Sequence, residues 1–380
     1  MVSTRLPRMQ ESATIKAANR ASEMLKQGID VINFNLGEPD FDTPKHICDA
    51  AADAMYRGET HYTPAAGIPE LREAIAEKLR VENGLEVKAS SVLVTPGAKQ
   101  AIFSIMMSVL GDREEAILFD PAWVSYEACI QFAGAEPVWV PTDPEKGFEP
   151  YDIGEYITDR TRMIVVNSPC NPTGGVYDKT TLRSIADHAI DHDLLVLSDE
   201  IYEKIIYEKE HISIGAMDGM QDRTITVNGF SKAYAMTGWR LGYVSAVPDI
   251  FKGLLKIQSN SVSSATTFVQ FGGVAALEGT QKPVYDMVKE FHARRDILVD
   301  GLNSIGLRCH KPDGAFYVFA DVSEFGDGDQ VTDQLLNEAH VSVTQGSSFG
   351  NSGKQFIRLS YATSQQRIHE GLERIDVVLC

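Results

Sequence analysis

Residues 194–202 read Leu-Leu-Val-Leu-Ser-Asp-Glu-Ile-Tyr. An unbroken apolar run that ends in polar residues predicts a short strand buried on both faces, as in parallel sheets covered by helices. Open α/β sheets bind their ligands at the carboxyl ends of the strands. The segment therefore predicts an α/β fold and places Asp199 at the edge of the sheet where we expect a binding site.

Similar apolar runs recur between about residues 90 and 245 and alternate with helical patterns such as 98–110 and 177–191. This alternation predicts an α/β domain with a mostly parallel sheet and helices on both faces. The predicted strands are 91–95, 116–119, 137–141, 163–167, 194–198, 224–227 and 241–246.

The length of 380 residues favours a large domain with a smaller one appended. After Pro248 the pattern changes to long helices and then to strands at 315–322, 341–344 and 356–361, with a helix between the first two and another after Thr363. We expect a large domain at 46–280 and a smaller α+β domain at 281–380. Residues 1–45, with a helix at 12–27 and an extended segment at 35–42, should pack on the smaller domain or on a partner chain.

Composition narrows the class of protein. The net charge of −18 opposes nucleic-acid binding, and no apolar run approaches the roughly 20 residues that span a bilayer. The N-terminus lacks the apolar stretch of a secretory signal, so we expect a cytoplasmic protein. The five cysteines are scattered, without C-x-x-C spacing, and we expect reduced thiols and no metal site. In so acidic a chain, lysines and arginines within motifs carry more information than usual.

The most reactive group of the sequence is expected in residues 227–243, Val-Asn-Gly-Phe-Ser-Lys-Ala-Tyr-Ala-Met-Thr-Gly-Trp-Arg-Leu-Gly-Tyr. Lys232 precedes Arg240 by eight residues in this glycine-rich stretch. An amine can form a Schiff base with an aldehyde, and a guanidinium can hold a phosphate dianion. Most Ser-Lys pairs are nevertheless plain surface, so the interpretation needs support from other segments.

Two predicted strands end in polar side chains that suit a pyridine ring. Asp199 could keep a ring nitrogen protonated, or it could simply cap a helix. Tyr202 could donate to a phenolate oxygen of the ring, or it could be a core tyrosine. The loop 167–175 contains two prolines and two glycines, which fix its backbone and would aim Asn171 at the same oxygen. A plain Asn-Pro turn is the alternative.

Anion-binding features follow other predicted strands. Residues 95–101 turn from strand to helix and expose backbone N–H groups near Gly97 and Ala98, which suits a phosphate. Neither a Walker loop nor a G-x-G-x-x-G fingerprint occurs where a nucleotide-binding domain needs it. Trp123 could stack on a planar ring or be structural. Arg358, inside an apolar strand, needs an anionic partner such as a carboxylate unless it lies on an exposed edge.

Taken in order along the chain, these motifs form a pattern. They are 37–44, 62–67, 171–174, 198–202, Lys232 and Arg358. With them the chain resembles, over nearly its whole length, the class I aminotransferases of fold type I that use pyridoxal phosphate, and most closely the prokaryotic aspartate aminotransferases. The resemblance implies a fold-type I architecture, pyridoxal 5'-phosphate as the cofactor, and a homodimer with shared active sites.

The resemblance also implies a role for each motif residue. Lys232 would hold the cofactor's aldehyde as a Schiff base and move the proton, and Asp199 would pair with the pyridine nitrogen. The other implied contacts are Tyr202 and Asn171 at the phenolate oxygen; Trp123 on the ring; Gly97, Ala98, Lys99, Ser231 and Arg240 around the phosphate; Tyr62 from the second subunit; and Gly37, Trp123, Asn171 and Arg358 around the amino acid. Many relatives have serine where this chain has Gly229, so one phosphate hydroxyl is expected to be missing.

The implied reaction is a ping-pong transamination from an L-amino acid to a 2-oxo acid, with aspartate and 2-oxoglutarate as the best candidates. Residues 259–267 hold no arginine for a distal carboxylate. In the resembling subgroup a lysine does this work with Ser and Thr near the N-terminus, which here implies Lys99, Ser12 and Thr14. Alternatively, Lys99 merely helps to neutralise the phosphate.

Other readings stay open to different degrees. An aminotransferase for aromatic amino acids, alanine or prephenate would share every cofactor contact, and a β-lyase is more distant. A regulator carrying this domain after a DNA-binding module is disfavoured, because Gly37 leaves no room for the module and the charge is wrong. A nicotinamide dehydrogenase is disfavoured by the missing phosphate fingerprint.

Overall fold

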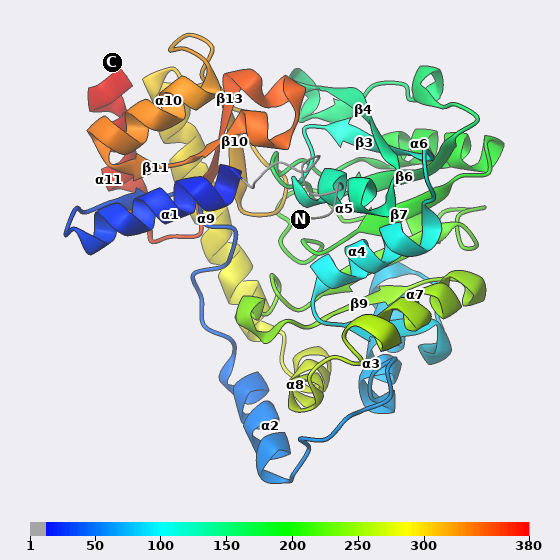
Figure 1. The fold of residues 1–380 in the computed structure, drawn as a ribbon. Coiled ribbons are helices and arrows are strands. Elements are labelled where there is room, and N and C mark those ends of the chain that lie inside the picture. Colours follow the sequence, from blue (N-terminus) through cyan, green and yellow to red (C-terminus); the bar gives the residue numbers. More distant parts are fainter. Residues whose placement is uncertain (1–12, 380) are drawn as a thin grey trace, which may run out of the picture.

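The computed structural model describes residues 13–379 and is built around an eight-stranded sheet (Figure 1). Its strands, in spatial order, are β2 (Val92–Thr95), β9 (Gly242–Ser245), β8 (Thr224–Gly229), β7 (Leu195–Asp199), β6 (Thr161–Asn167), β3 (Glu115–Asp120), β4 (Glu136–Asp143) and β5 (Glu149–Pro150). From β8 to β4 the neighbours are parallel, whereas β9 and β5 run antiparallel to theirs. The expected mostly parallel α/β sheet is confirmed.

The sheet is buried on both faces because consecutive apolar side chains of each central strand point to opposite sides. In β7, Leu197 packs in a cluster with α4 (Ala98–Val109), α5 (Ser125–Ala133) and α7 (Pro248–Ser261). Val196, the residue before it, packs in another cluster with α6 (Lys179–Asp191). Each such side chain contributes about 1.5–3 kcal/mol by leaving water. The result is a three-layer arrangement that aligns the carboxyl ends of β6, β7 and β8.

One edge of the large sheet is covered by helices that come before its first strand and after its strand β9 in the sequence. Cluster residues of α2 (Lys45–Tyr56), α3 (Pro69–Asn83) and α8 (Thr267–Glu278) pack with β2 and β9. Figure 1 shows α2 standing out from the body of the molecule beside α8. Residues 57–68, between α2 and α3, therefore run along the outside of this edge.

The C-terminal part of the chain forms a three-stranded antiparallel sheet of β10 (Tyr317–Asp321), β13 (Phe356–Ser360) and β12 (Thr344–Gln345). The long helix α9 (Lys282–Ile305) and α11 (Gln365–Leu379) pack their apolar side chains on it. α10 (Gly328–Gln334) lies between β10 and β12 in the sequence. The expected α+β character of this region is confirmed.

The predicted strand 341–344 was wrong as a single element. The chain forms two short strands instead, β11 (Val341–Ser342) and β12. β11 pairs in parallel with β1 (Ile32–Asn33), whereas β12 pairs with β13, because the chain changes partner at Val343. α1 (Ala13–Lys26) lies against this region, with Arg20 ion-paired to Asp333 at 2.7 Å (Figure 1). None of the helices in residues 13–379 combines the length and apolar character needed to cross a membrane.

A buried arginine joins the segment after β7 to the C-terminal part of the chain. Arg295 of α9 is fully buried and donates to both carboxylate oxygens of Glu208 at 2.6 Å and to the Pro312 carbonyl at 2.9 Å. Its guanidinium also stacks 4.6 Å from the ring of Tyr207. The hydrogen bonds from Arg295 lower the pKa of Glu208 to about 2. This arginine therefore couples three segments that are distant in the sequence.

We predict that Arg295→Ala lowers the melting temperature by roughly 3–8 °C, because it removes a buried cation with its whole set of partners. Arg308→Ala is the matched control, since Arg308 is 68% exposed and its pair with Asp321 spans 3.2 Å. Exposed pairs contribute about 0–1 kcal/mol, so the control should melt within about 2 °C of the parent protein. Equal losses in the two variants, measured by calorimetry, would contradict the role given to Arg295.

Candidate active site

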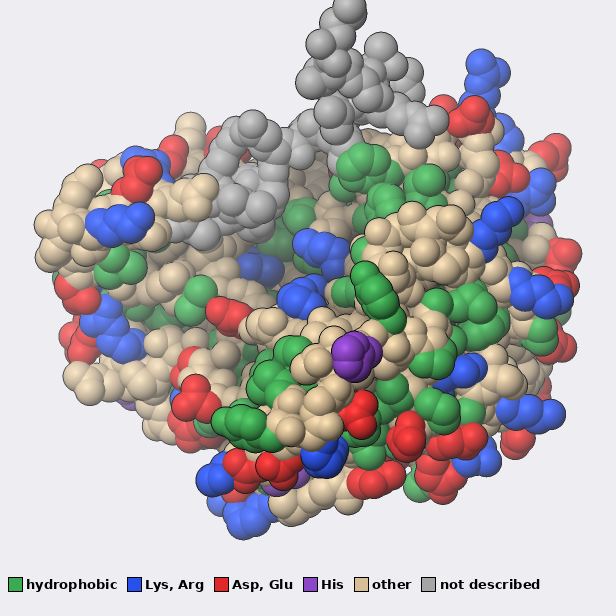
Figure 2. Space-filling model, turned by 60° about the horizontal axis from the view of Figure 1, so that its bottom comes forward, with side chains coloured by type: hydrophobic (Ala, Val, Ile, Leu, Met, Phe, Trp, Pro, Cys, Tyr) green, Lys and Arg blue, Asp and Glu red, His purple; other side chains and the backbone are tan. Residues whose placement is uncertain are grey.

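A cavity of about 530 Å³ lies at the carboxyl ends of β6, β7 and β8, where the large sheet meets the C-terminal part of the chain. Figure 2 shows Lys and Arg side chains gathered in the hollow of this face. The size falls within the range of ordinary cofactor and substrate pockets. The lining residues used below are Asn35, Gly37, Glu38, Ala98, Lys99, Trp123, Tyr126, Asn167, Asn171, Asp199, Tyr202, Ser231, Lys232, Arg240, Tyr317, Phe349 and Arg358.

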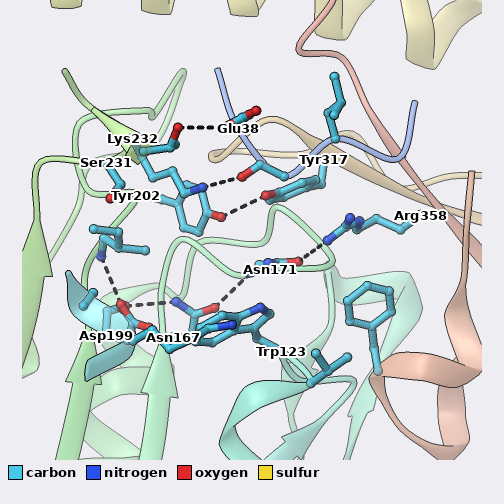
Figure 3. Close-up of a pocket in the computed structure, with 18 of the residues that line it drawn as sticks. Glu38, Trp123, Asn167, Asn171, Asp199, Tyr202, Ser231, Lys232, Tyr317 and Arg358 are labelled. Atoms are coloured by element: carbon cyan, nitrogen blue, oxygen red, sulfur yellow. Dashed lines mark hydrogen bonds between the residues drawn. The ribbon is translucent and has the colours of Figure 1, made fainter. Parts of the chain in front are cut away.

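Lys232 follows β8, and its amine points into the cavity, where it donates to the Gly37 carbonyl (Figure 3). The ring of Tyr202 lies 5.8 Å from the amine. The pKa of Lys232 is lowered to about 8, mainly by removal of the amine from water; the positive charges of Arg358 and Arg240 act in the same direction, and the charge of Glu38 opposes them. About a fifth of these amines are therefore neutral, and hence nucleophilic, near pH 7.4.

Asp199 ends β7 and is 3% exposed. Its carboxylate accepts a hydrogen bond from the Tyr126 hydroxyl at 2.6 Å and one from the Ile201 N–H at 3.2 Å. Burial raises its pKa to about 6, although these hydrogen bonds and the charge of Lys232 favour the ionised form. A carboxylate so poorly solvated would gain from a cationic partner in the cavity.

The loop after β6 is fixed to β7 by one side chain. Asn167 accepts from the Asn171 N–H at 2.9 Å and donates to the Asp199 carbonyl at 3.0 Å (Figure 3). The loop thus holds Asn171 over the same edge of the sheet. Nearby, the hydroxyls of Tyr202 and Tyr317 share a hydrogen bond of 2.9 Å. Polar groups from the large sheet and from β10 therefore meet in one cavity.

Arg358 lies in β13 and is 4% exposed. It donates to the Asn171 side-chain oxygen at 2.9 Å and to Asn35 and Thr344 at 3.2 and 3.3 Å, and its guanidinium lies 4.4 Å from the Tyr317 ring. Burial lowers its pKa, and no carboxylate among residues 13–379 is ion-paired with it. Its Nε has no hydrogen-bond partner in that part of the chain. A buried cation of this kind is suited to an incoming carboxylate.

A second cationic corner lies at the start of α4. Gly97 caps this helix with a φ of +84°, and a Cβ there would lie 2.6 Å from Nη2 of Arg240. A Cβ on Gly242 would lie 2.5 Å from the Ala98 nitrogen. The two glycines therefore allow a guanidinium and a helix N-terminus to approach each other closely, and both attract a phosphate.

Lys99 is a further cation in the cavity. Its amine lies 4.9 Å from the ring of Trp123, and burial lowers its pKa, with the charge of Arg240 adding to the effect. The ring of Trp123 in turn packs edge-on against Tyr126 at 5.4 Å between centroids. The side of the cavity facing Trp123 is therefore both aromatic and positively charged.

The structure brings most of the residues singled out from the sequence into this cavity. Gly97 itself does not line the cavity, but it lies against the side chain of Arg240, which does. Tyr62 does not line the cavity of its own chain and is 92% exposed. Thr14 belongs to α1, and Ser12 lies outside the described residues. The others, Gly37, Ala98, Lys99, Trp123, Asn171, Asp199, Tyr202, Ser231, Lys232, Arg240 and Arg358, all line it.

The loop that carries Tyr62 is held by buried glutamines. Gln270 accepts from the Ile68 N–H at 2.8 Å and donates to the Thr63 hydroxyl at 3.2 Å. Gln258 donates to the Ala65 carbonyl at 2.5 Å. An exposed tyrosine on a loop fixed in this way is suited to contact another molecule.

Several polar or aromatic lining residues escaped the sequence interpretation. Asn167 begins the loop 167–175, Tyr126 lies three residues after Trp123 and Glu38 follows Gly37 directly, so position alone could have suggested them. Nothing near Tyr317 or Phe349 in the sequence marks them. They reach the cavity only because β10 and the turn before β13 pack on the large sheet.

Comparison with known proteins gives a consistent picture. Residues 29–375 match the family model of aminotransferase class I and II. The aspartate/prephenate aminotransferase of Thermus thermophilus is 43% identical, covering 100% of this chain and 98% of its own. A solved aspartate aminotransferase from Thermus thermophilus with maleate superposes with a TM-score of 0.97 at 43% identity and full coverage of both chains. An aromatic aminotransferase from Pyrococcus horikoshii gives a TM-score of 0.91 at 44% identity, and the superposition covers 94% of this chain and 98% of that structure.

The lowered pKa of Lys232 makes a prediction about chemical reactivity. In protein treated with hydroxylamine and dialysed, which frees amines from any bound aldehyde, about half of the Lys232 amines should be neutral at pH 8. Competitive acylation followed by peptide mass spectrometry should find Lys232 reacting well below the pH at which Lys45 reacts. Lys45 is the control because its ion pair with Asp49 raises its pKa. A shared pH profile would contradict the geometry described for the amine.

Proposed function

Because the chain belongs to the class I and II aminotransferases, a family whose class I members use pyridoxal phosphate, we propose that it binds this cofactor around Lys232 and transfers the amino group of L-aspartate to 2-oxoglutarate. The observation that carries the proposal is a pair of cations in one cavity. One is an amine with a pKa of about 8, and the other is a buried arginine that has no carboxylate partner among the described residues. The amine, in its neutral form, can react with an aldehyde, and the guanidinium can bind the carboxylate of an amino acid.

The residues present fit the cofactor. When bound, pyridoxal phosphate supplies an aldehyde that combines with amines and a protonated ring that withdraws electrons. Asp199 would hold the ring nitrogen, and its raised pKa is the sign of a carboxylate that lacks a cation. The close approach of Gly97 to Arg240 supports a phosphate cradle there. The remaining contacts in the proposal are Ala98 and Ser231 at the phosphate, Trp123 on the ring, and Asn171 and Tyr202 at the phenolate oxygen.

In the proposed reaction Lys232 both binds and moves a proton. Its neutral amine, once released by the incoming amino acid, accepts the proton from Cα of that substrate. Asp199 stays ionised and stabilises positive charge at the far side of the ring. The hydrogen bond between Tyr202 and Tyr317 fixes the direction of the Tyr202 hydroxyl, and the Tyr202 ring lies 5.8 Å from the amine. Membership of the aminotransferase family supports a ping-pong order, in which the first half-reaction takes the amino group from the amino acid and the second passes it to the 2-oxo acid.

Arg358 would bind the α-carboxylate of the substrate. Its fork is held in place by the Asn171 side chain and by the ring of Tyr317, while Nε has no hydrogen-bond partner among the described residues. A planar guanidinium binds a carboxylate through two parallel hydrogen bonds, so it fixes direction as well as charge. Together with Gly37 it would present Cα to Lys232, whose amine already reaches the Gly37 carbonyl.

The distal carboxylate of aspartate would be bound by Lys99, with Ser12 and Thr14 completing the site. Lys99 is the cavity lysine other than Lys232, and its partial desolvation would strengthen a bond to a carboxylate. A second support comes from relatives. The names of the compared proteins include aspartate aminotransferases, and one solved structure was obtained with maleate, a dicarboxylate.

A second candidate is an aminotransferase that prefers aromatic amino acids or prephenate. Lys99 packs over Trp123 at 4.9 Å, and an aromatic wall of this kind also accepts an apolar ring. Relatives of both kinds occur, since one is named aspartate/prephenate aminotransferase and another aromatic aminotransferase. A β-lyase reaction would use the same cofactor contacts, and no feature of the cavity favours it.

We also propose a homodimer with shared sites. Tyr62 is almost fully exposed, yet its loop is fixed by Gln258 and Gln270. This combination supports a tyrosine that reaches the phosphate of the partner subunit. Tyr56, on the exposed end of α2, is 90% exposed and would lie in the same interface.

The first prediction from this proposal concerns Lys232→Ala. Because the variant lacks both the binding amine and the proton carrier, transamination of aspartate should fall by about a thousandfold or more. Circular dichroism and the melting temperature of the apoenzyme should match those of the parent protein. Lys45→Ala, a surface change, should keep full activity. A Lys232→Ala protein with near-normal rates would sink the assignment.

The second prediction concerns Lys99→Ala. Loss of one charge-assisted hydrogen bond should lower kcat/KM for aspartate by roughly 10- to 100-fold. The value for phenylalanine should change less than about threefold, because that substrate has no distal carboxylate. Steady-state kinetics on both substrates checks this. Equal losses for aspartate and phenylalanine would show instead that Lys99 acts on the phosphate.

A further inference from the structure

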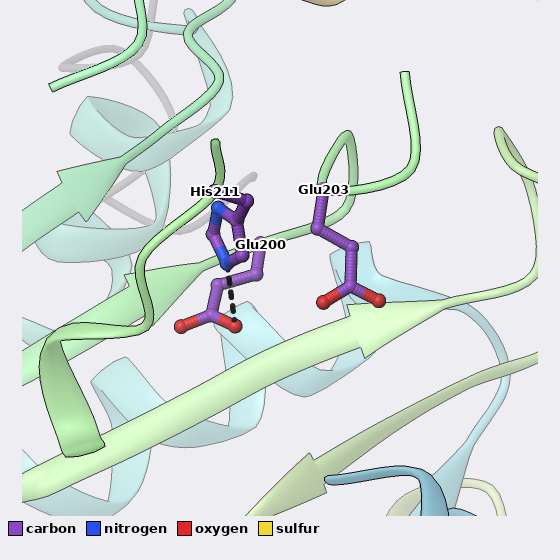
Figure 4. Close-up of side chains that lie close together, drawn as sticks. All are labelled: Glu200, Glu203 and His211. Carbon is purple, nitrogen blue, oxygen red and sulfur yellow. Dashed lines mark hydrogen bonds and ion pairs between the residues drawn. The ribbon is translucent and has the colours of Figure 1, made fainter. Parts of the chain in front are cut away.

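Two buried carboxylates lie directly behind the wall of the cavity. Asp199 and Tyr202 line the cavity, whereas Glu200 and Glu203, each the next residue along the chain, do not. Glu200 is 1% exposed and Glu203 is 9% exposed. Figure 4 shows both glutamates with His211, whose ring is bonded to Glu200. The turn that carries two proposed cofactor contacts therefore has a charged anchor on its opposite side.

Glu200 is held by four neighbours. One oxygen accepts from the hydroxyls of Ser198 at 2.9 Å and Ser213 at 2.7 Å. The other accepts from the Asn83 amide at 2.9 Å and lies 3.1 Å from Nε2 of His211. Each oxygen of this buried carboxylate therefore has two polar neighbours. Glu200 therefore places a negative charge on the residue next to Asp199.

Glu203 is neutralised by a lysine. The amine of Lys78 in α3 bonds to Glu203 and to the Asn83 oxygen, and the Asn83 amide donates to Glu203 at 2.7 Å. Burial by itself would raise the pKa of Glu203, but the charges of Lys78 and His211 outweigh it and bring the pKa to about 2. Glu200, Glu203 and His211 are close enough together to hold a metal ion, but Lys78 already supplies the positive charge at Glu203.

With Glu203 paired to Lys78, the net charge of the other pair, Glu200 and His211, depends on whether His211 is protonated. The charged groups next to Glu200, Glu203 and Lys78 include Glu82, which pairs with Lys204 at 2.7 Å and also lies 3.7 Å from the amine of Lys78. The nearby hydroxyls of Tyr234 and Tyr243 stay neutral, because burial raises their pKa. The two glutamates are therefore balanced only when both Lys78 and His211 carry a proton. Nδ1 of His211 has no partner among residues 13–379, so Glu200 alone is bonded to this ring.

We propose that His211 is a positioning residue that acts through Glu200: its imidazolium cancels the charge next to Asp199 and so keeps Asp199 ionised beneath the ring of the bound cofactor. The inference rests on the proposed function, because it assigns Asp199 to the cofactor nitrogen. Glu200 and Glu203 anchor the turn that carries Asp199 and Tyr202, and His211 sets the electrostatic potential of that anchor.

The direction of each effect agrees with this role. Burial lowers the pKa of His211, but the charges of Glu200 and Glu203 outweigh it, and the net pKa is raised. Burial is the main cause of the raised pKa of Asp199, and the charge of Glu200 adds to it. Without the proton on His211, Glu200 would raise the pKa of Asp199 further. A protonated Asp199 cannot pair with a protonated ring, so cofactor affinity would then fail at a higher pH.

The test is the dissociation constant of pyridoxal phosphate, measured by absorbance and fluorescence from pH 5 to 8.5 with apoenzyme, and the midpoint of its loss at acid pH. His211→Gln should move this midpoint up by roughly half to one pH unit, since Glu200 is left uncompensated. Glu200→Gln should move it down by a similar amount. The double variant should return close to the parent protein. His192→Gln, an exposed histidine at the end of α6, is the control and should not shift.

The opposite signs separate electrostatics from mere loosening of the turn. A structural role alone would weaken binding in both single variants and would not be repaired in the double variant. Shifts of the same sign, or midpoints equal to that of His192→Gln, overturn the proposal. Glu203→Gln carries the same predicted sign as Glu200→Gln and replaces it if that variant does not fold. A parent protein that binds no pyridoxal phosphate at any pH would instead refute the proposed function, before the variants are compared.

Discussion

Removal of the Lys232 amine from water is the constraint on which the rest of the site depends. A lysine in this position loses much of its affinity for a proton, and the charges of Arg358 and Arg240 lower its pKa further. The fold supports this arrangement by aligning the ends of β6, β7 and β8, so that Asn171, Asp199 and Lys232 face the same cavity. The C-terminal sheet then covers the amine and contributes Arg358 from the opposite side.

The distribution of charge explains how an acidic protein handles anionic ligands. The chain carries a net charge of −18, yet four cations gather in one cavity, namely Lys99, Lys232, Arg240 and Arg358. The acidic groups among the described residues that line it are fewer, namely Asp199 and Glu38. Such a pocket attracts a phosphate and a carboxylate together, as an amino acid and pyridoxal phosphate require. The role proposed for the buried cluster behind it, in which His211 bonds to Glu200, is to limit the effect of the Glu200 charge on Asp199.

Much of this could be read from the sequence, for a physical reason. Asp199, Asn171 and Lys232 each follow an apolar strand, and parallel strands end at a common edge, so local pattern was enough to bring them together. Contacts between distant segments were less accessible. Tyr317 approaches Tyr202 from 115 residues away, and the division of residues 341–345 between two sheets depends on which partner strands are near. Tyr62 could not be placed within one chain, since its loop faces outward.

The most direct test is to trap the cofactor on the protein. Holoenzyme reconstituted with pyridoxal phosphate is reduced with borohydride, digested and mapped by mass spectrometry. The predicted result is one phosphopyridoxyl group per chain, on the peptide that contains Lys232. Modification of Lys99, the other lysine of the cavity, or labelling spread over surface lysines would contradict the central role given to Lys232.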